Sequence, residues 1–490
     1  MKIESLWIAT TPSTDFPVLK TNIETDVIIV GGGIAGINAA YFLKNKGFKV
    51  IVIEATYVVT GTSGNTTAKV TSQHELKYYY LKNHFGKEKA QIYADSNQWA
   101  ITELGKIITK EKIDCDFHNL PSYNYARTEK DLEDVKKETK TAKELHLPAS
   151  FVNSVDSLPF NILGAIRFDN QAYFHPRKFL LSLANKINRD GSYIFEKTQA
   201  LNIKEKNNHC EVITDKGNIK AKYAVVATNL PFYDKNGLFS NLYQMRSYVL
   251  GIKINNKMPE GTFIGPQIED LSFRPHKSGK NEWLLIGGAD HPAKEKVDAY
   301  AKYQELEQMA SKLFDIKNIE FWWAAQDTIP QDKIPYIGFM PDSKRILVTT
   351  GFGEWGMTTS FVAAKVLTDL ISGTKNDWTD LYDPARLTSS SKPSNRKPIT
   401  ETQEGGEFMD LKTNEGKVIS QKGEPIAVYK DNSGKTHTVS AVCTHMGCTV
   451  GWNNKDKTWD CPCHGSRYDK NGKVIHGPAV KDLPKKELGK

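Results

Sequence analysis

Residues 26–54 read DVIIVGGGIAGINAAYFLKNKGFKVIVIE, and this stretch decides the fold of the larger part of the chain. The apolar run 26–30 predicts a buried strand, and the helical spacing of residues 35–46 predicts a helix that ends before Gly47. Residues 49–54 predict a second buried strand. Together these elements form a βαβ unit, which is typical of an α/β domain built on a parallel sheet.

The glycine-rich turn of this unit has the pattern of a dinucleotide-binding loop. Gly31 permits a tight turn, Gly33 lets the backbone approach a pyrophosphate, and Gly36 lets the helix pack closely on the strand. The helix N-terminus then presents unpaired N–H groups to the phosphates. Glu54 ends the second strand, where a carboxylate accepts both hydroxyls of an adenosine ribose and disfavours a 2′-phosphate. A purely structural glycine turn is the alternative.

Segments further along the chain favour FAD over NAD. Residues 61–74 read GTSGNTTAKVTSQH, and the hydroxyls and backbone amides of this stretch can line a diphosphate and a flavin. The candidates are Thr62, Ser63, Thr66 and Thr67. A further cofactor-domain strand is expected at 223–228. A second glycine-rich loop, GFGEWG from residue 351 to 356, follows the apolar run 345–350 and matches the dinucleotide pattern, so a second nucleotide site is one interpretation.

The C-terminal hundred residues carry a second cofactor motif. Four of the six cysteines lie between residues 443 and 463, which favours a metal site over a disulfide framework in a chain without a secretory start. Two Cys-His pairs occur there, Cys443 with His445 and Cys461 with His464. Two thiolates and two imidazoles suit either a Cys2His2 zinc site or a [2Fe–2S] cluster with histidine ligands, and spacing alone leaves both open.

The sequences around these pairs, CTHMGC and CPCHGS, resemble the two boxes of the Rieske family, and in particular its high-potential respiratory branch. The resemblance implies that the two cysteines bind one iron and the two histidines bind the other. It further implies a disulfide between Cys448 and Cys463 that ties the two loops together. It also implies that the hydroxyls of Ser466 and Tyr468 hydrogen-bond cluster sulfur and raise the potential. Rieske oxygenases lack the extra cysteine pair, and we find no mononuclear iron motif, so ring hydroxylation is not expected.

The N-terminal region resembles the D-amino-acid oxidase/glycine oxidase superfamily, and more closely the bacterial FAD-dependent oxidoreductases with a fused C-terminal Rieske domain. In that superfamily the late glycine loop lies against the flavin ring, which implies cofactor contacts at Gly353, Trp355 and Gly356. Trp355 filling the core is the alternative. Thr66 and Thr67 stand where some relatives carry an anchoring histidine. We therefore expect non-covalent FAD, although His74 is nearby.

The substrate side is less defined. Arg246 or Arg274 is a candidate clamp for a substrate carboxylate, with a surface ion pair as the alternative. His276 or His291 is a candidate base, with a structural histidine as the alternative. The roles of Gln326 and Asp327, near the flavin-facing region that the resemblance implies, are left open.

The expected domains are an FAD-dependent oxidoreductase at 1–386, with FAD-binding and interleaved substrate subdomains, a linker at 387–399, and a Rieske domain at 400–490. The expected fold class is an α/β Rossmann-like FAD domain with an α+β substrate domain, plus a small all-β domain. Residues 1–24 are expected to be an irregular lead-in, and helices are expected at 130–145 and 176–187. The net charge is +8, but the lysines are scattered, which argues against nucleic acid. We find no transmembrane or secretory segment, so a cytoplasmic location is expected.

Fusing a two-electron carrier to a one-electron carrier predicts a converter between an organic oxidation and a one-electron chain. We expect a dehydrogenase that oxidises an amine, amino acid or related small molecule and passes electrons through the cluster to a carrier protein or quinone. One alternative is a reductase or demethylase with reversed electron flow. Another is an oxygen-using oxidase in which the Rieske domain is a redox-sensing module.

Overall fold

The computed structural model describes residues 4–387 and 411–487, apart from positions 235–237, 267–270, 294, 296, 422, 446, 455, 463, 464 and 478. The linker predicted at 387–399 lies outside the described residues except for its first position. The predicted domain boundaries therefore stay predictions.

A sheet with a parallel centre forms the core of the nucleotide-binding part. Its strands are β1 Ile23–Val30, β2 Val50–Ile53, β9 Tyr193–Phe195, β10 Ala200–Glu205, β11 Cys210–Thr214, β12 Asn218–Val226, β18 Tyr336–Phe339 and β19 Ile346–Thr350. Within the described residues the order is β10-β11-β12-β1-β2-β9, with β19 paired to β12 and β18 to β19. The pairs β1–β12, β1–β2, β2–β9 and β12–β19 are parallel.

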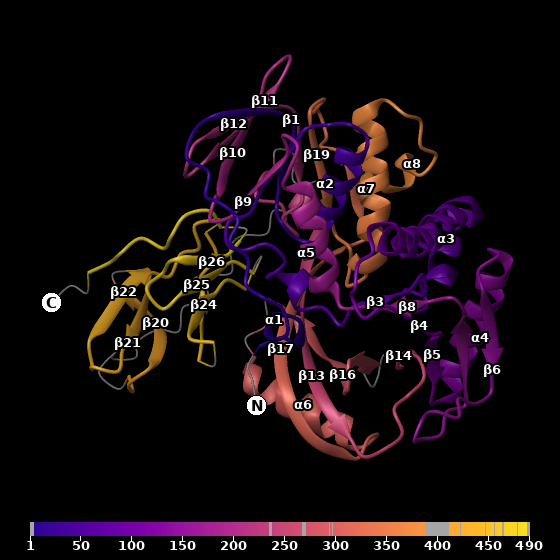
Figure 1. The fold of residues 1–490 in the computed structure, drawn as a ribbon. Coiled ribbons are helices and arrows are strands. Elements are labelled where there is room, and N and C mark those ends of the chain that lie inside the picture. The colour runs from indigo at the N-terminus through magenta and orange to yellow at the C-terminus, as the bar shows by residue number, and fades with distance from the viewer. Residues whose placement is uncertain are drawn as a thin grey trace.

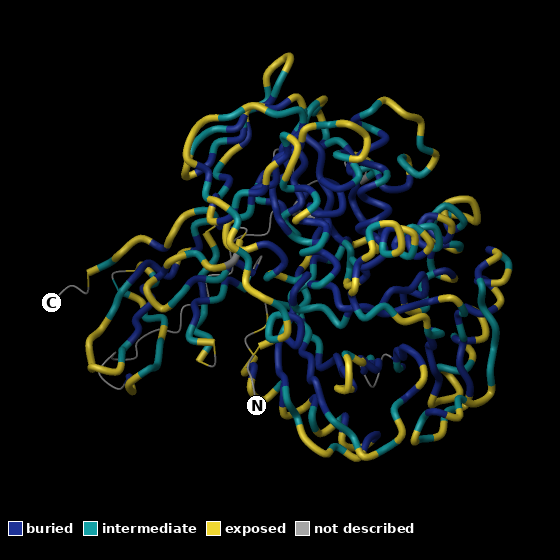
Figure 2. Tube along the Cα trace, viewed as in Figure 1, coloured by how far each residue is buried: buried dark blue, intermediate teal, exposed yellow. Residues whose placement is uncertain are grey.

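Both faces of this sheet are covered, which explains the unbroken apolar run in β1. Helices α2 Ile34–Asn45, α5 Pro176–Ile187 and α7 Gly356–Ser372 pack together over one face (Figure 1). Val27 and Ile29 belong to the core on the helix side, whereas Ile28 and Val30 belong to the core on the opposite side. Because successive side chains of a strand alternate between faces, a strand buried on both sides has no polar positions. Figure 2 shows this central layer as mostly buried.

A second, mixed sheet forms the predicted α+β substrate part. Its order in the described residues is β17-β13-β16-β15-β14-β5-β7-β6. The bounds are β5 Ser122–Ala126, β6 Ala149–Val152, β7 Gly164–Phe168, β13 Leu242–Ile254, β14 Thr262–Ile264, β15 Leu271–Ser278, β16 Asn281–Pro292 and β17 Ile316–Pro330. Helix α6 Ala299–Ser311 packs on β13, β16 and β17, and α4 Glu129–Glu144 packs on β5, β6 and β7.

Smaller elements join the two sheets. They are α1 Leu6–Ala9, η1 Thr62–Gly64, β3 Lys69–Val70, α3 Lys77–Glu111, β4 His118–Asn119, β8 Ala172–Tyr173, η2 Leu238–Asn241, α8 Thr379–Tyr382 and η3 Pro384–Leu387. The expectation of an irregular lead-in is wrong for α1, because Leu6 and Trp7 are fully buried. The indole N–H of Trp7 donates to the carbonyl oxygen of Thr66 at 2.6 Å, so the N-terminal segment supports the predicted flavin loop.

The C-terminal domain is all-β and has its own core. Its strands are β20 Glu415–Gln421, β21 Glu424–Lys430, β22 Thr436–Ser440, β23 Gly451–Asn453, β24 Thr458–Asp460, β25 Arg467–Asp469 and β26 Val474–His476. They form the sheets β20-β21-β22 and β23-β24-β25-β26, drawn in orange to yellow beside the N-terminal part in Figure 1. Among the described residues, no helix is both long and apolar enough to cross a bilayer. The cytoplasmic location stays a prediction.

Candidate functional site

The glycine turn between β1 and α2 is too tight for side chains. Gly31 has φ +112°, and a Cβ atom there would lie 2.5 Å from the carbonyl oxygen of Ala227. A Cβ at Gly36 would lie 1.9 Å from the carbonyl oxygen of Gly31, so helix and strand are in direct backbone contact. The carboxylate of Glu54 accepts N–H bonds from Gly32 at 2.9 Å and Thr56 at 3.0 Å. This close approach at a helix N-terminus is the geometry that a dinucleotide pyrophosphate needs.

The predicted flavin loop, residues 62–67, is held in place from several elements. The Ser63 hydroxyl accepts the Ile34 N–H of α2 at 2.8 Å, and the Thr62 hydroxyl donates to the carbonyl oxygen of Gln326 in β17 at 2.8 Å. The Thr67 carbonyl accepts a hydrogen bond from Arg274. The loop thus lies between the nucleotide-binding sheet and the second sheet.

The late glycine loop adjoins the same region. Gly353 has φ +54°, and its N–H donates to the Thr328 carbonyl oxygen of β17 at 3.1 Å. Gly356 begins α7, and Trp355 stacks on His74 with ring centroids 4.7 Å apart. Burial lowers the pKa of His74 well below its ordinary value. Its ring nitrogens contact the Tyr93 hydroxyl at 2.7 Å and the Thr71 carbonyl oxygen at 2.9 Å.

A cavity of about 490 Å³ opens beside these two loops. Side chains of both charge signs line it, including Lys69, Asp290, Asp327 and Glu354, together with Thr66, Thr67 and Trp355. The Lys69 ammonium donates to the Thr67 hydroxyl at 3.1 Å and to the Ser272 hydroxyl at 2.8 Å. Burial, with a smaller contribution from the positive charge of Arg274, lowers the pKa of Lys69 to about 7. Burial raises the pKa of Asp327 to about 6. The cavity therefore offers cationic and anionic partners to a small polar molecule.

Neither predicted arginine clamp lines this cavity wall in the described part of the chain. Arg246 extends to the C-terminal domain, where Nη1 donates to Asp460 at 3.1 Å and Nη2 to Asp456 at 3.2 Å. Arg274 is fully buried and donates to the backbone carbonyl oxygens of Thr67, Pro275 and Phe174. Burial lowers the pKa of Arg274 to about 9. Arg246 thus joins two domains, and Arg274 supports the flavin loop.

Among the described residues that line the cavity, neither of the two predicted bases, His276 and His291, is found. His276 is buried with its ring 4.8 Å from that of Trp7, and burial lowers its pKa. His291 contacts the Tyr248 hydroxyl and the Pro292 carbonyl oxygen, each at 3.0 Å. Burial also lowers the pKa of His291. Both histidines therefore have the geometry of structural residues.

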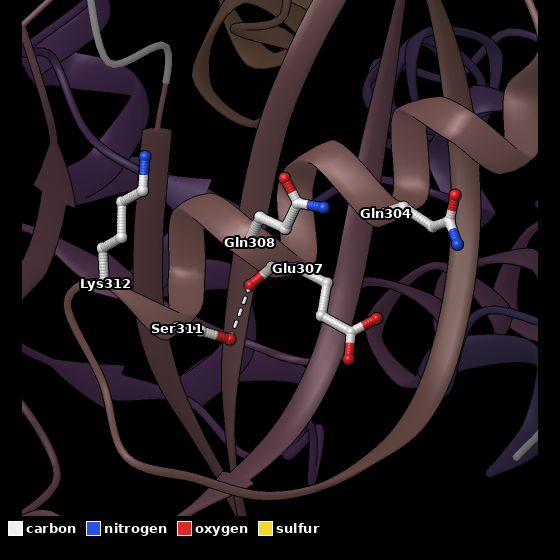
Figure 3. A pocket seen from close by; sticks show the side chains of 5 residues that line it. All are labelled: Gln304, Glu307, Gln308, Ser311 and Lys312. Carbon is white, nitrogen blue, oxygen red and sulfur yellow. Dashed lines mark hydrogen bonds between the residues drawn. The ribbon is translucent and has the colours of Figure 1, made fainter.

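Sequence reasoning missed Lys69 and left Asp327 without a role. The available signal for Lys69 was a lysine inside the short apolar stretch AKV, within the predicted flavin loop region. A further depression of the surface, on α6, is lined by Gln304, Glu307, Gln308, Ser311 and Lys312 (Figure 3). Its side chains come from α6 and from Lys312, the residue that caps this helix, so no second element closes over it.

The two predicted cluster loops share one backbone pattern. In the first loop, the Cys443 N–H donates to the carbonyl oxygen of Cys448 at 2.8 Å, and the Gly447 N–H donates to the carbonyl oxygen of Cys443 at 2.9 Å. In the second loop, the Cys461 N–H donates to the carbonyl oxygen of Ser466 at 2.7 Å, and the Gly465 N–H donates to the carbonyl oxygen of Cys461 at 3.0 Å. Both glycines have positive φ, +79° and +74°. Two matched turns thus present their first cysteines in the same manner.

The thiols of Cys443 and Cys461 converge at the centre of the domain. Both are buried, and hydrogen bonding from Cys461 lowers the pKa of Cys443 to about 6. The Tyr468 hydroxyl lies 3.1 Å from Cys443 Sγ and accepts the Thr444 N–H at 3.2 Å. Within the described residues no group of three or more acidic, cysteine or histidine side chains forms a single-ion site. The predicted ligand His464 lies outside those residues.

The predicted disulfide is described at one end only. Cys448 is disulfide-bonded. Its expected partner, Cys463, lies outside the described residues, so the pairing stays a prediction. Cys115 and Cys210 are buried free thiols, as are the two predicted iron ligands Cys443 and Cys461.

Comparison with known proteins finds a family match for the larger N-terminal part of the chain and another for the smaller C-terminal part. The family model for FAD dependent oxidoreductase (DAO) matches residues 26–370, and that for the Rieske [2Fe-2S] domain matches residues 403–487. A putative Rieske 2Fe-2S iron-sulfur protein, YhfW of Bacillus subtilis (strain 168), is 35% identical over 99% of this chain and 98% of its own length. The cytochrome b6-f complex iron-sulfur subunit of Synechococcus sp. (strain JA-3-3Ab) is 47% identical over 14% of this chain and 41% of its own. The solved glycine oxidase from Geobacillus kaustophilus has a TM-score of 0.63 at 17% identity, covering 74% of this chain and 99% of that one.

The fold and the two sites define an oxidoreductase with two redox cofactors, FAD and a [2Fe–2S] cluster. The chain belongs to the DAO family of FAD dependent oxidoreductases and carries a C-terminal Rieske domain, an arrangement matched along almost its whole length by YhfW. The residues fit both groups. Glycine at positions 31 and 36 lets strand, turn and helix meet in the direct backbone contact that a pyrophosphate-binding turn requires, and the paired cysteine turns with the Tyr468 hydroxyl suit a cluster.

Proposed function

We propose that this protein is an FAD-dependent dehydrogenase that oxidises a small amine or amino acid and delivers electrons through its Rieske domain to a one-electron carrier protein or quinone. FAD takes up two electrons together, whereas a [2Fe–2S] cluster carries one at a time. The observation that carries the proposal is the position of β17, because Asp327 in this strand lines the cavity while its neighbour Gln326 contacts Gly465 of a cluster loop.

The cavity residues support a substrate that bears both an amine and an anionic group. Because burial raises the pKa of Asp327 only to about 6, its carboxylate is ionised at neutral pH and attracts an ammonium group. The Lys69 amino group is held by the hydroxyls of Thr67 and Ser272 and has a pKa of about 7, so a substrate carboxylate beside it would favour its charged form. Glycine oxidase, a fold neighbour, is named for an amino acid, which agrees with this substrate class.

An anaerobic titration tests the proposal directly. The purified holoprotein is mixed with a panel of amines, amino acids and hydroxy acids, and flavin bleaching and cluster reduction are followed in one cuvette. We expect an amine or amino acid to bleach the flavin first and then reduce the cluster. Bleaching without cluster reduction supports the oxidase alternative, and flavin reduction only from a pre-reduced cluster supports reversed flow.

A variant separates the roles of the two domains. In His464→Ala, which removes a predicted iron ligand, substrate should still bleach the flavin, while transfer to an added one-electron acceptor is lost. The control is His437→Ala in β22, a histidine outside the two Cys-His pairs whose imidazole contacts Asp431 at 2.7 Å. Unchanged acceptor reduction by His464→Ala contradicts the proposed circuit.

A further inference from the structure

The ribbon formed by β13 and β17 has two functional faces. Ser247, Val249, Ala325 and Asp327 line the substrate cavity. Because strand side chains alternate between faces, the intervening residues point the other way. Arg246 lies directly opposite Gln326 in the pairing register of the two strands, so their side chains share that outer face.

Arg246 binds the C-terminal domain through two ion pairs. It reaches Asp460 at 3.1 Å and Asp456 at 3.2 Å, and its side chain is only 13% exposed. Both carboxylates also form ion pairs with Arg467 of the Rieske domain. These ion pairs within the domain fix the positions of the two carboxylates that Arg246 binds. A pair with so little exposure is less screened by water and salt than an ordinary surface ion pair.

Gln326 contacts the second cluster loop. A Cβ at Gly465 would lie 1.5 Å from Gln326 Nε2, so the glycine backbone rests directly on this amide. The amide donates to Gln244 Oε1 at 3.1 Å, and Gln244 in turn donates to the Thr328 hydroxyl at 2.6 Å. The backbone carbonyl of Gln326 accepts bonds from Thr62 at 2.8 Å and from Asn229 at 3.0 Å. One residue thus joins the loop that precedes β25 to the predicted flavin loop.

We propose that Arg246 and Gln326 form an internal docking face that holds the Rieske domain in position for electron exchange with the flavin site. The two are positioning residues, and their role rests on the proposed function. Bound FAD would accept the substrate C–H as hydride, while the N–H proton goes to solvent. Reoxidation would release the proton of the hydride to solvent and pass its two electrons on singly, so that the cluster is reduced by one electron and reoxidised by a one-electron carrier protein or quinone before it takes the second.

The docking face is tested with charge reversal in the full-length holoprotein. The variants are Arg246→Glu, the charge swap Arg246→Glu with Asp456→Arg, and the control Lys220→Glu, which reverses a charge in an exposed ion pair with Glu24. After flash photoreduction by a deazaflavin, the rate at which electrons equilibrate between flavin and cluster is recorded. We expect Arg246→Glu to slow equilibration about tenfold or more, the charge swap to recover part of the rate, and the control to match wild type.

A second measurement does not depend on electron transfer. Small-angle X-ray scattering should give a larger radius of gyration for Arg246→Glu than for wild type and Lys220→Glu. Gln326→Ala should keep the wild-type radius but equilibrate more slowly, because the ion pairs remain while the contact at Gly465 is lost. Wild-type rates in both Arg246→Glu and Gln326→Ala, or an unchanged radius in Arg246→Glu, overturn the proposal. Because neither readout needs a substrate, failure to find one counts against the proposed function and not against the docking face.

Discussion

The Tyr468 hydroxyl contacts Cys443, one of the predicted iron ligands. It is fully buried, lies 3.1 Å from Cys443 Sγ and accepts the Thr444 N–H. A hydrogen bond to cluster sulfur stabilises the reduced, more negative state. We expect Tyr468→Phe to lower the reduction potential by roughly 60 mV, because a bond worth about 1.4 kcal/mol changes a one-electron equilibrium about tenfold. A redox titration followed by electron paramagnetic resonance measures this shift.

The matched control is Tyr429→Phe. The Tyr429 hydroxyl donates to the side-chain oxygen of Asn414 at 3.0 Å and not to a predicted iron ligand. The control should keep the wild-type potential. A Tyr468→Phe potential equal to that of wild type contradicts a hydrogen bond from this hydroxyl to the cluster.

At the scale of elements, the start of α3 depends on a carboxylate from α4. Leu76, at the N-cap, makes no side-chain cap bond, and Glu138 instead accepts the N–H groups of Tyr78 and Tyr79, each at 2.7 Å. Burial raises the pKa of Glu138 to about 7 from an ordinary value of 4.5. The folded state therefore binds more protons than the unfolded state between these two values. Stability from this group is fully present below the lower value and is lost as pH rises to the upper one.

We expect Glu138→Gln to flatten this part of the stability profile. Glutamine is neutral throughout, so the variant should not show the loss of about 3 kcal/mol that wild type shows between the two pKa values. Urea unfolding at several pH values gives the slope of the free energy of unfolding against pH for wild type and for Glu138→Gln. Glu133→Gln, a change of an exposed side chain on the same helix, serves as the control. Equal slopes in Glu138→Gln and wild type argue against a buried carboxyl of raised pKa.

At the scale of the whole molecule, the described residues form two sets of cores. The hydrophobic cluster that contains Trp459 and both free cluster cysteines is separate from the clusters of the N-terminal part. Since each part has its own core, we expect two calorimetric transitions. Removal of the cluster by chelation under reducing conditions should lower the midpoint temperature of the C-terminal transition and leave that of the N-terminal transition unchanged. The reason is that bound metal stabilises the domain that holds it.

Flavin fluorescence identifies which transition belongs to which domain. Release of FAD should coincide with the N-terminal transition in both the complete and the cluster-free protein. A single transition that shifts as a whole on cluster removal contradicts independent cores. It would indicate that the contact at Arg246 couples the two domains into one folding unit.

The sequence by itself determined the local elements and both cofactors. The strand, glycine turn and helix expected at 26–46 match β1 and α2 within a few residues, and the helix expected at 176–187 is α5 with the same bounds. These predictions succeed because the signals are local. A glycine in a tight turn is constrained by its immediate neighbours, and the residues around each Cys-His pair, rather than the spacing alone, distinguish a Rieske cluster from a zinc site.

Only the tertiary structure decided which polar side chains face the cavity and which join the domains. Arg246 and Asp327 lie on opposite faces of one ribbon, but the faces depend on the pairing register of strands about 80 residues apart in sequence, and on which later domain covers them. A one-residue slip of β17 would turn Asp327 to the outer face beside Arg246 and Gln326 to the cavity. Composition and spacing carry no information on that register, so the predicted arginine clamp meets the Rieske domain while Lys69 and Asp327 line the cavity.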